Sequence, residues 1–289
     1  MPFITSSDDT KIYYTYTRAR SVQKKEKQAK KTQANKSQTN KTIIFIHGWT
    51  MNHTGWKSEI AFFQNKGYDC IAVDLRGHGK SDKPKKRSAY TMNYFVKDIN
   101  TIVEKNNLVK PILIGHSLGG MIILHYLKKY QEKIAKIVLI DTTYTNPLTQ
   151  IPFLKYIAIT PLVKNIAYYI IDHNEIHKKH YESIDFSSLK YKSDFKLWLK
   201  GIQGMPIESI TACFLSILEN DEKTILSSIN IPTLIIVGEK DNVTPKIASR
   251  NMHSLIQKSQ LEIIPKGKHD TIIQNPHFIN KKINQFLKK

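Results

Sequence analysis

Cysteine is scarce in this sequence: Cys70 and Cys213 are the only two in 289 residues. Cys70 adjoins the apolar run at residues 71–73, which is typical of a packed interior. We interpret both cysteines as small buried hydrophobic residues rather than as a disulfide or a catalytic thiol. Such usage is consistent with a reducing compartment.

The sequence also lacks segments that would address it to a membrane. Residues 1–9 have neither a basic stretch nor an apolar core, so they do not resemble a secretory signal. The longest apolar stretch, residues 151–171, is too interrupted for a membrane span. Its interruptions are Pro152, Lys155, Pro161 and Lys164. We therefore expect a soluble, cytoplasmic protein without a membrane span.

Acidic residues are few relative to basic ones: 24 Asp and Glu oppose 44 Lys and Arg, for a formal charge of +20. Residues 18–42 hold nine of the basic residues and one Glu, a net charge of +8, with almost no apolar side chain. A segment of this composition cannot bury enough surface to fold, which predicts a flexible basic insertion. It could contact nucleic acid or an acidic membrane. A solvated insertion is favoured, because no aromatic residues are interleaved for base stacking.

Short apolar strands alternate with helical patterns along most of the chain. We predict strands at residues 11–16, 42–46, 70–73, 111–114, 135–140, 232–237 and 261–264, and helices at 94–105, 121–130 and 277–287. This alternation predicts an α/β fold with a mostly parallel sheet and helices on both faces. The length suits one large domain, or a core with a small insertion.

The alternation of strands and helices stops over residues 143–210, where no strand is evident and apolar side chains recur at helical spacing. We interpret this segment as a helical cap inserted into the core. The core is then made of residues 1–142, which carry the basic insertion, and of residues 211–289. The alternative is a set of peripheral helices with no role as a lid.

One serine lies in a pattern typical of a nucleophile. In the run Gly115-His116-Ser117-Leu118-Gly119, the serine has glycines two residues away on either side, follows an apolar strand and opens a helix. Such a turn lifts the hydroxyl out of the sheet, and only small neighbours fit. An ordinary glycine-rich turn with a helix-capping serine is the alternative.

A serine nucleophile needs a base and a carboxylate that orients the base. Among the 11 histidines, His269 follows the last predicted strand and should lie at the same sheet edge as Ser117. Asp241 follows the strand at 232–237, and the order Ser117, Asp241, His269 is the one expected on this sheet. Asp141, which ends the preceding strand, is the rival acid. Asp270 adjoins His269 but should point away.

The remaining candidate histidines favour other roles. His116 is enclosed in the serine turn, and His53 and His78 lie in loops, where structural or pocket-lining roles are expected. His173, His177 and His180 could suggest a metal, but on a polar helix a solvated face is favoured. We therefore predict no metal site and no cofactor.

Together these motifs resemble the α/β-hydrolase superfamily, in the capped branch that includes esterases, cofactor-free haloperoxidases, carbon–carbon bond hydrolases and epoxide hydrolases. The matching pieces span nearly the whole chain, apart from the predicted cap and the basic insertion. They are His47-Gly48-Trp49, Asp74-Leu75-Arg76-Gly77-His78-Gly79-Lys80-Ser81, the run 115–120, the run 238–245 and Gly267-Lys268-His269-Asp270. The resemblance implies an eight-stranded sheet and an oxyanion hole made by the backbone N–H groups of Trp49 and Leu118.

The expected activity is hydrolysis of a small-molecule carboxylic ester through an acyl-enzyme. Serine at position 117 argues against the epoxide hydrolases and haloalkane dehalogenases, which use a carboxylate nucleophile. A carbon–carbon bond hydrolase with the same three residues is the first alternative. It would need a cation for a substrate carboxylate, and Arg76 is placed more for its own turn than for that role. A receptor or scaffold without activity is the second.

Overall fold

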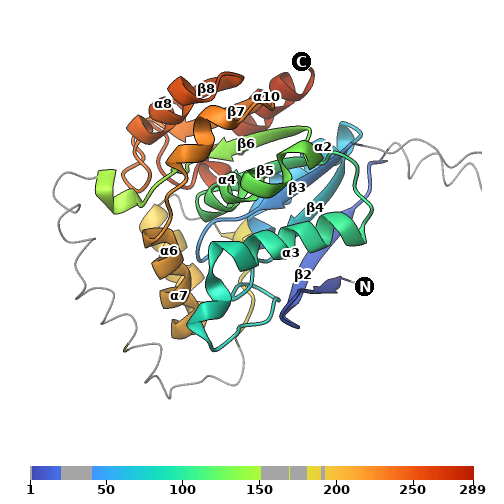
Figure 1. The fold of residues 1–289 in the computed structure, drawn as a ribbon, viewed down its shortest axis with the longest axis vertical. Helices are drawn as coiled ribbons and strands as arrows, with labels where there is room; N and C mark the ends of the chain where they lie inside the picture. Colours follow the sequence, from blue (N-terminus) through green and yellow to red (C-terminus); the bar gives the residue numbers. More distant parts are fainter. Residues whose placement is uncertain (1, 21–40, 151–168, 170–180, 190–192) are drawn as a thin grey trace, which may run out of the picture.

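The computed structural model of the chain describes residues 2–20, 41–150, 169, 181–189 and 193–289. Its strands form one eight-stranded sheet in the order β1-β2-β4-β3-β5-β6-β7-β8. β1 and β2 pair antiparallel with each other, β2 pairs antiparallel with β4, and all later pairs are parallel. Figure 1 shows this sheet running through the molecule. The predicted mostly parallel eight-stranded α/β fold is confirmed.

The bounds of the elements agree with the predicted ranges to within a few residues where a range was predicted. The strands are β1 (Phe3–Thr5), β2 (Lys11–Thr17), β3 (Thr42–Ile46), β4 (Asp69–Val73), β5 (Ile112–His116), β6 (Lys136–Ile140), β7 (Thr233–Gly238) and β8 (Ser259–Ile264). The α-helices are α2 (Lys57–Asn65), α3 (Met92–Lys105), α4 (Leu118–Tyr130), α6 (Asp194–Gln203), α7 (Ile207–Leu218), α8 (Lys246–Leu255), α9 (Thr271–Gln274) and α10 (Pro276–Leu287). Short 3-10 helices are η1 (His53–Trp56), η2 (Arg87–Tyr90), η3 (Gln131–Lys133), η4 (Pro147–Gln150), η5 (Phe186–Ser188) and η6 (Lys223–Ser228).

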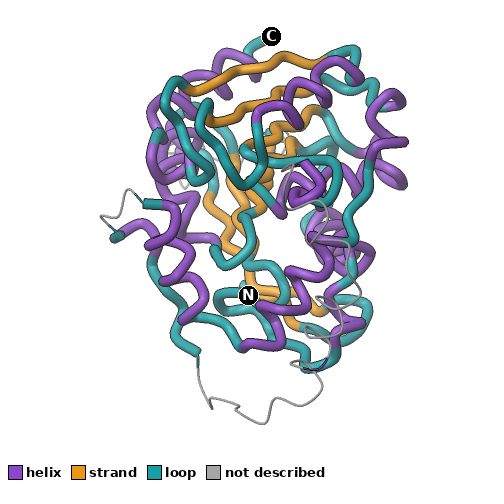
Figure 2. The backbone as a smooth tube through the Cα atoms, turned by 90° about the vertical axis from the view of Figure 1, so that its left-hand side faces the viewer, coloured by secondary structure: helices purple, strands orange, loops and turns teal. Residues whose placement is uncertain are grey.

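The central strands are buried on both faces, and their alternating side chains feed two separate cores. Ile44 and Ile46 of β3 face one core, with side chains of α3, α4 and α8. Ile43 and Phe45 of the same strand face the other, with side chains of α2 and α10. Figure 2 shows helices on both sides of the strands. A sheet covered on both faces explains why its strands read as continuous apolar runs rather than alternating ones.

Parallel strands end at one common edge, and this edge collects the loops that matter for function. In α/β sheets, ligands bind beyond the carboxyl ends of the strands. The loop after β3 carries Trp49, and the turn after β5 carries Ser117. The loops after β7 and β8 carry Asp241 and His269. Residues far apart in sequence are thereby delivered to one place.

The segment between β6 and β7 is helical where the structure describes it. It contributes α6 and α7, which lie at the lower left of the sheet in Figure 1. The outgoing and returning chain meet in an antiparallel bridge between Thr145 and Asp221. α7 continues through residue 210, at which the sequence predicts the end of the cap. The predicted helical residues within 151–168, and the histidines at 173, 177 and 180, lie outside the described residues.

Most of the basic insertion, residues 21–40, also lies outside the described residues, but the ends that flank it are close together. The Ala19 N–H donates to Asp69 Oδ1 at 2.8 Å. The Asp69 N–H donates to the Lys41 carbonyl oxygen at 3.2 Å. Both ends of the insertion therefore meet at the first residue of β4, and a short turn could join them.

The expectation for the two cysteines is also met. Cys70 and Cys213 are both free and buried, as predicted for small hydrophobic residues. Burial raises the pKa of the Cys70 thiol to about 12, so it stays neutral. No helix within the described residues is long and apolar enough to cross a membrane.

Candidate active site

Ser117 occupies the sharp turn between β5 and α4. Its φ of 50° and ψ of −117° lie outside the regions that non-glycine residues ordinarily adopt. The turn is crowded: a β-carbon on Gly119 would lie 2.2 Å from the carbonyl oxygen of Ile46. Thr142 Oγ1 fixes the turn from behind by donating to the Ser117 carbonyl oxygen at 2.7 Å. The strand–turn–helix geometry holds the Ser117 hydroxyl at the edge of the sheet, as a nucleophile requires.

His269 lies between β8 and α9, beside Ser117. Its Nε2 is 3.0 Å from Ser117 Oγ, and its Nδ1 is 3.0 Å from Asp241 Oδ2. The two contacts fit an imidazole that carries its proton on Nδ1, donates to the carboxylate and accepts from the serine hydroxyl. Three side chains from three different loops are thus joined in one hydrogen-bonded chain.

Asp241 is held in place by the residues that follow it. Its Oδ1 accepts from the N–H groups of Val243 at 2.8 Å and Thr244 at 2.9 Å, and its Oδ2 accepts from the Thr244 hydroxyl at 2.7 Å. Burial tends to raise the pKa of Asp241, but His269 and the Thr244 hydrogen bonds bring it below the ordinary value. Asp241 is therefore favoured as an ionised partner for His269.

The opposite trend in His269 has the same origin. Burial tends to lower the pKa of its imidazole, but the Asp241 carboxylate outweighs this effect and raises the pKa above the ordinary histidine value. A histidine with a raised pKa is a stronger base once its proton has left. This pair of opposite shifts is typical of functional sites, although structural ion pairs produce it as well.

Asp141, the rival acid, is buried and has other partners. Its Oδ1 accepts from the Gly238 N–H at 2.9 Å, and its Oδ2 accepts from the Thr271 N–H at 3.2 Å and from the Thr271 hydroxyl. Burial and the charge of Asp241 raise the pKa of Asp141 well above its ordinary value. Asp141 therefore joins the end of β7 to the start of α9, just after His269, and Asp241 is the residue in contact with the imidazole.

The two backbone donors predicted for an oxyanion hole flank Ser117. α4 begins at Leu118, so the Leu118 N–H is a first-turn donor without an acceptor inside the helix. Among the described residues, the Trp49 N–H has no hydrogen-bond acceptor. The preceding residue, Gly48, packs directly on the serine: a β-carbon there would lie 3.1 Å from Ser117 Cβ. The loop that carries Trp49 therefore packs against Ser117, and neither N–H is committed to an acceptor within the described residues.

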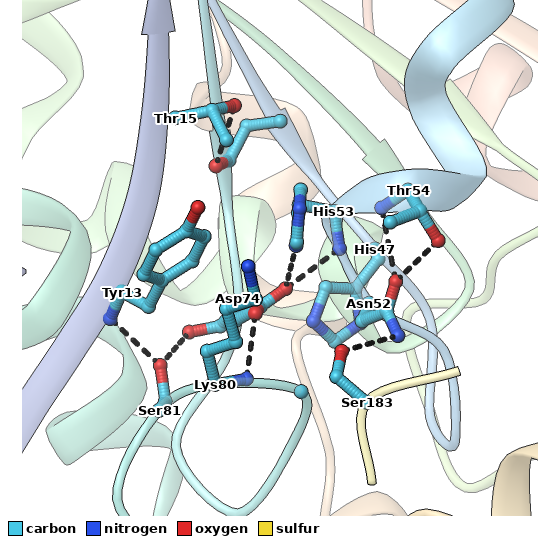
Figure 3. A network of polar contacts seen from close by, with 12 residues as sticks. Tyr13, Thr15, His47, Asn52, His53, Thr54, Asp74, Lys80, Ser81 and Ser183 are labelled. Atoms are coloured by element: carbon cyan, nitrogen blue, oxygen red, sulfur yellow. Dashed lines mark hydrogen bonds and ion pairs between the residues drawn. The ribbon is translucent and has the colours of Figure 1, made fainter. Parts of the chain in front are cut away.

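The other histidines have structural partners. His116 Nε2 lies 3.0 Å from the His269 carbonyl oxygen, and burial lowers the pKa of His116 to about 3. His78 Nδ1 lies 2.9 Å from the Arg76 carbonyl oxygen. His53 Nδ1 lies 2.7 Å from Asp74 Oδ1, within the polar network of Figure 3. Within the described residues, no group of three or more His, Cys, Asp or Glu side chains is placed to hold a metal ion.

Arg76 is fully engaged within the core. Its guanidinium donates to Asp98 through Nε and Nη2, both at 2.7 Å, and to Asp8 through Nη1 at 2.8 Å. The Arg76 and Asp98 side chains are fully buried and Asp8 is partly exposed, so this paired cation is not available to a substrate carboxylate. The carbon–carbon bond hydrolase alternative loses the cation considered for it.

Sequence reasoning missed Thr244 and Thr142, which hold the acid and the serine turn. A local signal existed for Thr244. Asp side chains commonly accept hydrogen bonds from the backbone N–H groups two and three residues later, which forms an Asx turn, and Thr244 is three residues after Asp241. No local pattern points to Thr142, which follows the neighbouring strand β6 and contacts Ser117 from there.

Comparison with known proteins agrees with this geometry. Residues 41–276 match the family model described as alpha/beta hydrolase fold. The chain belongs to the α/β-hydrolase family. This hydrolase is 26% identical to the non-heme chloroperoxidase of Burkholderia pyrrocinia, over 99% of both chains. It is 25% identical to the bifunctional esterase/perhydrolase of Acinetobacter calcoaceticus, over 85% of this chain and 91% of that one.

Solved structures show the same fold. The esterase from Exiguobacterium antarcticum superposes with a TM-score of 0.72 at 21% identity, covering 99% of both chains. At this level of identity the likeness establishes the fold, and the chemistry is argued from the side chains.

Proposed function

We propose that this protein is a serine hydrolase that cleaves carboxylic esters of small or medium acyl groups through an acyl-enzyme. The observation that carries the proposal is the continuous hydrogen-bonded chain from Ser117 Oγ through His269 to Asp241, with each link 3.0 Å long. The esterase named among its relatives supports the same reaction class. No cofactor enters the proposed chemistry.

The first half of the reaction forms the acyl-enzyme. Ser117 Oγ bonds to the ester carbonyl carbon while His269 Nε2 takes the hydroxyl proton. The negative charge that develops on the carbonyl oxygen is stabilised by the N–H groups of Trp49 and Leu118. The tetrahedral intermediate then collapses, the bond to the alcohol oxygen breaks, and His269 returns the proton to that oxygen. Asp241 holds the imidazole in the required tautomer throughout.

The second half regenerates the enzyme. Water attacks the acyl carbon, His269 takes its proton, and Ser117 leaves with the proton as the acid product departs. Turnover of p-nitrophenyl acetate or butyrate by the purified protein tests this proposal. It also separates the enzyme from a scaffold without activity, which would not turn over any activated ester.

Peracid formation is a second candidate, favoured by similarity to a protein named non-heme chloroperoxidase over 99% of this chain and to one named bifunctional esterase/perhydrolase over 85% of it. Here hydrogen peroxide replaces water: its oxygen bonds to the acyl carbon, Ser117 leaves with a proton, and a peroxy acid is released. Incubation with an acetate ester and peroxide should then yield peracetic acid, and the Ser117→Ala protein should yield none.

The pH dependence of turnover follows from the raised pKa of His269. Only the neutral imidazole can accept the serine proton, so kcat/KM should rise with pH as His269 loses its proton. Because Asp241 raises this pKa, the pH at which kcat/KM reaches half its maximum should be higher than ~6.5, the ordinary histidine pKa. A pH series with p-nitrophenyl butyrate measures the midpoint. A midpoint below the ordinary value would contradict the inferred Asp241–His269 coupling.

Acyl chain length should have an optimum, because aromatic rings narrow the space near Ser117. Trp49 stacks on Phe214 of α7, with ring centroids 5.2 Å apart, and meets Trp198 of α6 at 6.5 Å. Each added methylene contributes about 0.8 kcal/mol only while it fits. p-Nitrophenyl acetate or butyrate should therefore be hydrolysed faster than the palmitate, without activation at a lipid–water interface. Rates that climb steadily to palmitate would indicate an open, lipase-like groove.

The basic insertion should be dispensable for this activity. Its flanking residues meet at Asp69, so residues 21–40 can be deleted and the chain closed with a short turn. Loop-closure entropy depends only weakly on length, so the melting temperature and ester turnover should be nearly unchanged. If the deletion abolished turnover in a protein that still melts cooperatively, the insertion would be part of the site.

A further inference from the structure

The residue after Trp49 has an unusual backbone conformation. Thr50 is buried and has a φ of 65°, in the left-handed region that β-branched residues rarely adopt. The direction of the Trp49 N–H depends on the backbone around it, and this N–H is one of the two proposed oxyanion donors. The surrounding structure must therefore hold Thr50 in a conformation that its own chemistry disfavours.

α6 supplies a close contact at this point. A β-carbon on Gly201 would lie 2.3 Å from the Thr50 carbonyl oxygen and 2.8 Å from Thr50 Cβ, which is closer than side chains approach. One turn earlier on the same helix, Trp198 contacts the ring of Trp49. α6 therefore rests on two consecutive residues of the oxyanion loop, which we define as residues 49–54.

The rest of the oxyanion loop is anchored on both sides; Figure 3 shows Asn52 in contact with Ser183 and His53 in contact with Asp74. On the side of the segment inserted after β6, Asn52 Nδ2 donates to the Ile184 carbonyl oxygen at 2.7 Å, and Thr54 Oγ1 accepts from the Phe186 N–H at 2.8 Å. On the core side, the His53 N–H donates to Asp74 Oδ1 at 2.7 Å. Residues 52–54 of the oxyanion loop are thus fixed by hydrogen bonds. A change in the packing of α6 would therefore act on the loop at Thr50.

We infer that Gly201 is a positioning residue for the oxyanion hole: by admitting α6 against the Thr50 peptide, it holds Thr50 in the left-handed conformation and aims the Trp49 N–H at the reacting carbonyl oxygen. The inference rests on the proposed ester hydrolysis. Gly201 touches no substrate, and its effect passes through Thr50 to Trp49. The inserted segment then contributes to transition-state stabilisation in addition to covering the site.

The test compares Gly201→Ala with Gly204→Ala, a matched change in the same part of the chain. A β-carbon on Gly204 would have no neighbour closer than 3.3 Å, so this control should behave as the parent protein. A small cavity bordered by Thr50, Met51 and Gly201 gives the oxyanion loop room to yield when Gly201→Ala adds its methyl group. The expected result is a misaligned donor in a folded protein.

Three measurements distinguish misalignment from general damage. With p-nitrophenyl butyrate, kcat of Gly201→Ala should fall by about tenfold to hundredfold, less than for complete loss of a donor, with KM within about twofold. Affinity for an alkyl trifluoromethyl ketone, whose carbonyl carbon bonds to Ser117 Oγ and whose oxygen becomes an oxyanion, should fall by a similar factor. The pH midpoint assigned to His269 should not move, because the base is untouched.

A double variant keeps the test decisive if Gly201→Ala alone does not fold. Thr50→Gly relieves the left-handed strain and removes Thr50 Cβ and Oγ1, two of the three atoms that a methyl group on residue 201 would meet. The double variant Gly201→Ala/Thr50→Gly should therefore fold. Its oxyanion loop, however, is no longer held by α6. Its kcat should be at least about tenfold below that of Thr50→Gly alone, within the range for a weakened oxyanion donor. The inference is overturned if the two match, or if folded Gly201→Ala keeps the parental kcat or ketone affinity. Absence of ester turnover in the parent protein would instead reject the proposed function.

Discussion

Replacement of Ser117 by alanine should abolish measurable ester hydrolysis while leaving the fold intact. Removing the nucleophile of a serine hydrolase lowers kcat by about 10⁶-fold, more than any other single change expected here. The hydroxyl's hydrogen-bond partner is His269, and the turn itself is held by backbone contacts and Thr142, so little stability should be lost. Turnover of p-nitrophenyl butyrate and the circular dichroism spectrum measure the two effects.

Ser249 offers the matched control for this substitution. It is buried in α8, and its hydroxyl has no hydrogen-bond partner among the described residues. Ser249→Ala should therefore retain the parental rate. Full activity of Ser117→Ala would mean that another residue attacks the ester.

Replacement of Asp241 by asparagine should lower kcat by about 10⁴-fold, because an amide stabilises the wrong imidazole tautomer. The side chain keeps its size, so the loop after β7 should keep its place. The pH midpoint of the remaining activity should also fall, since the charge that raises the pKa of His269 is gone.

Asp141→Asn provides the comparison, because Asp141 is equally buried and lies at the neighbouring strand end. An amide nitrogen cannot accept from both the N–H and the hydroxyl of Thr271, so this variant should melt at a lower temperature. Its kcat should fall far less than that of Asp241→Asn. If the two variants exchanged these outcomes, Asp141 would be the residue that orients the base.

The sheet and the loops that carry the site were predictable because their signals are local. β3, β5 and β7 are short apolar runs, and a small or polar residue marks the carboxyl edge of each: His47 follows β3, His116 ends β5 and Gly238 ends β7. The turn at Ser117 is specified by the five residues 115–119. Glycine is needed at position 119 because a side chain there would clash with the carbonyl oxygen of Ile46 at the end of β3. Strand order predicts that Asp241 and His269 lie at the same edge as Ser117, because parallel strands deliver their following loops to one edge. It predicts the same for Asp141, so the choice between the two acids needed the structure.

Elements with weak patterns were missed. β1 has only three residues, and it pairs at the sheet margin, where the apolar signal is faint. α2 and α8 were not predicted; each is largely polar on its outer surface and buries only a few side chains. α7 runs past residue 210, the predicted end of the cap, because Ala212, Cys213 and Leu215 continue its apolar face into the core.

Contacts between segments far apart in the chain could not be predicted from the sequence. Asn52 binds Ile184 across 132 residues, and Gly201 approaches Thr50 across a similar separation. No periodicity or motif encodes such pairs, which depend on how α6 packs against the loop after β3. The left-handed conformation of Thr50 is equally hidden, because threonine is a residue that ordinarily avoids it.

The central claim, that Ser117 is the nucleophile activated by His269, is tested most directly by covalent labelling of the protein with a fluorophosphonate. The phosphorus should bond to one serine oxygen with loss of fluoride, and peptide mapping by mass spectrometry should place the adduct on Ser117. The Ser117→Ala protein should remain unlabelled under the same conditions. An adduct on a different serine, or equal labelling of the Ser117→Ala protein, would contradict the claim.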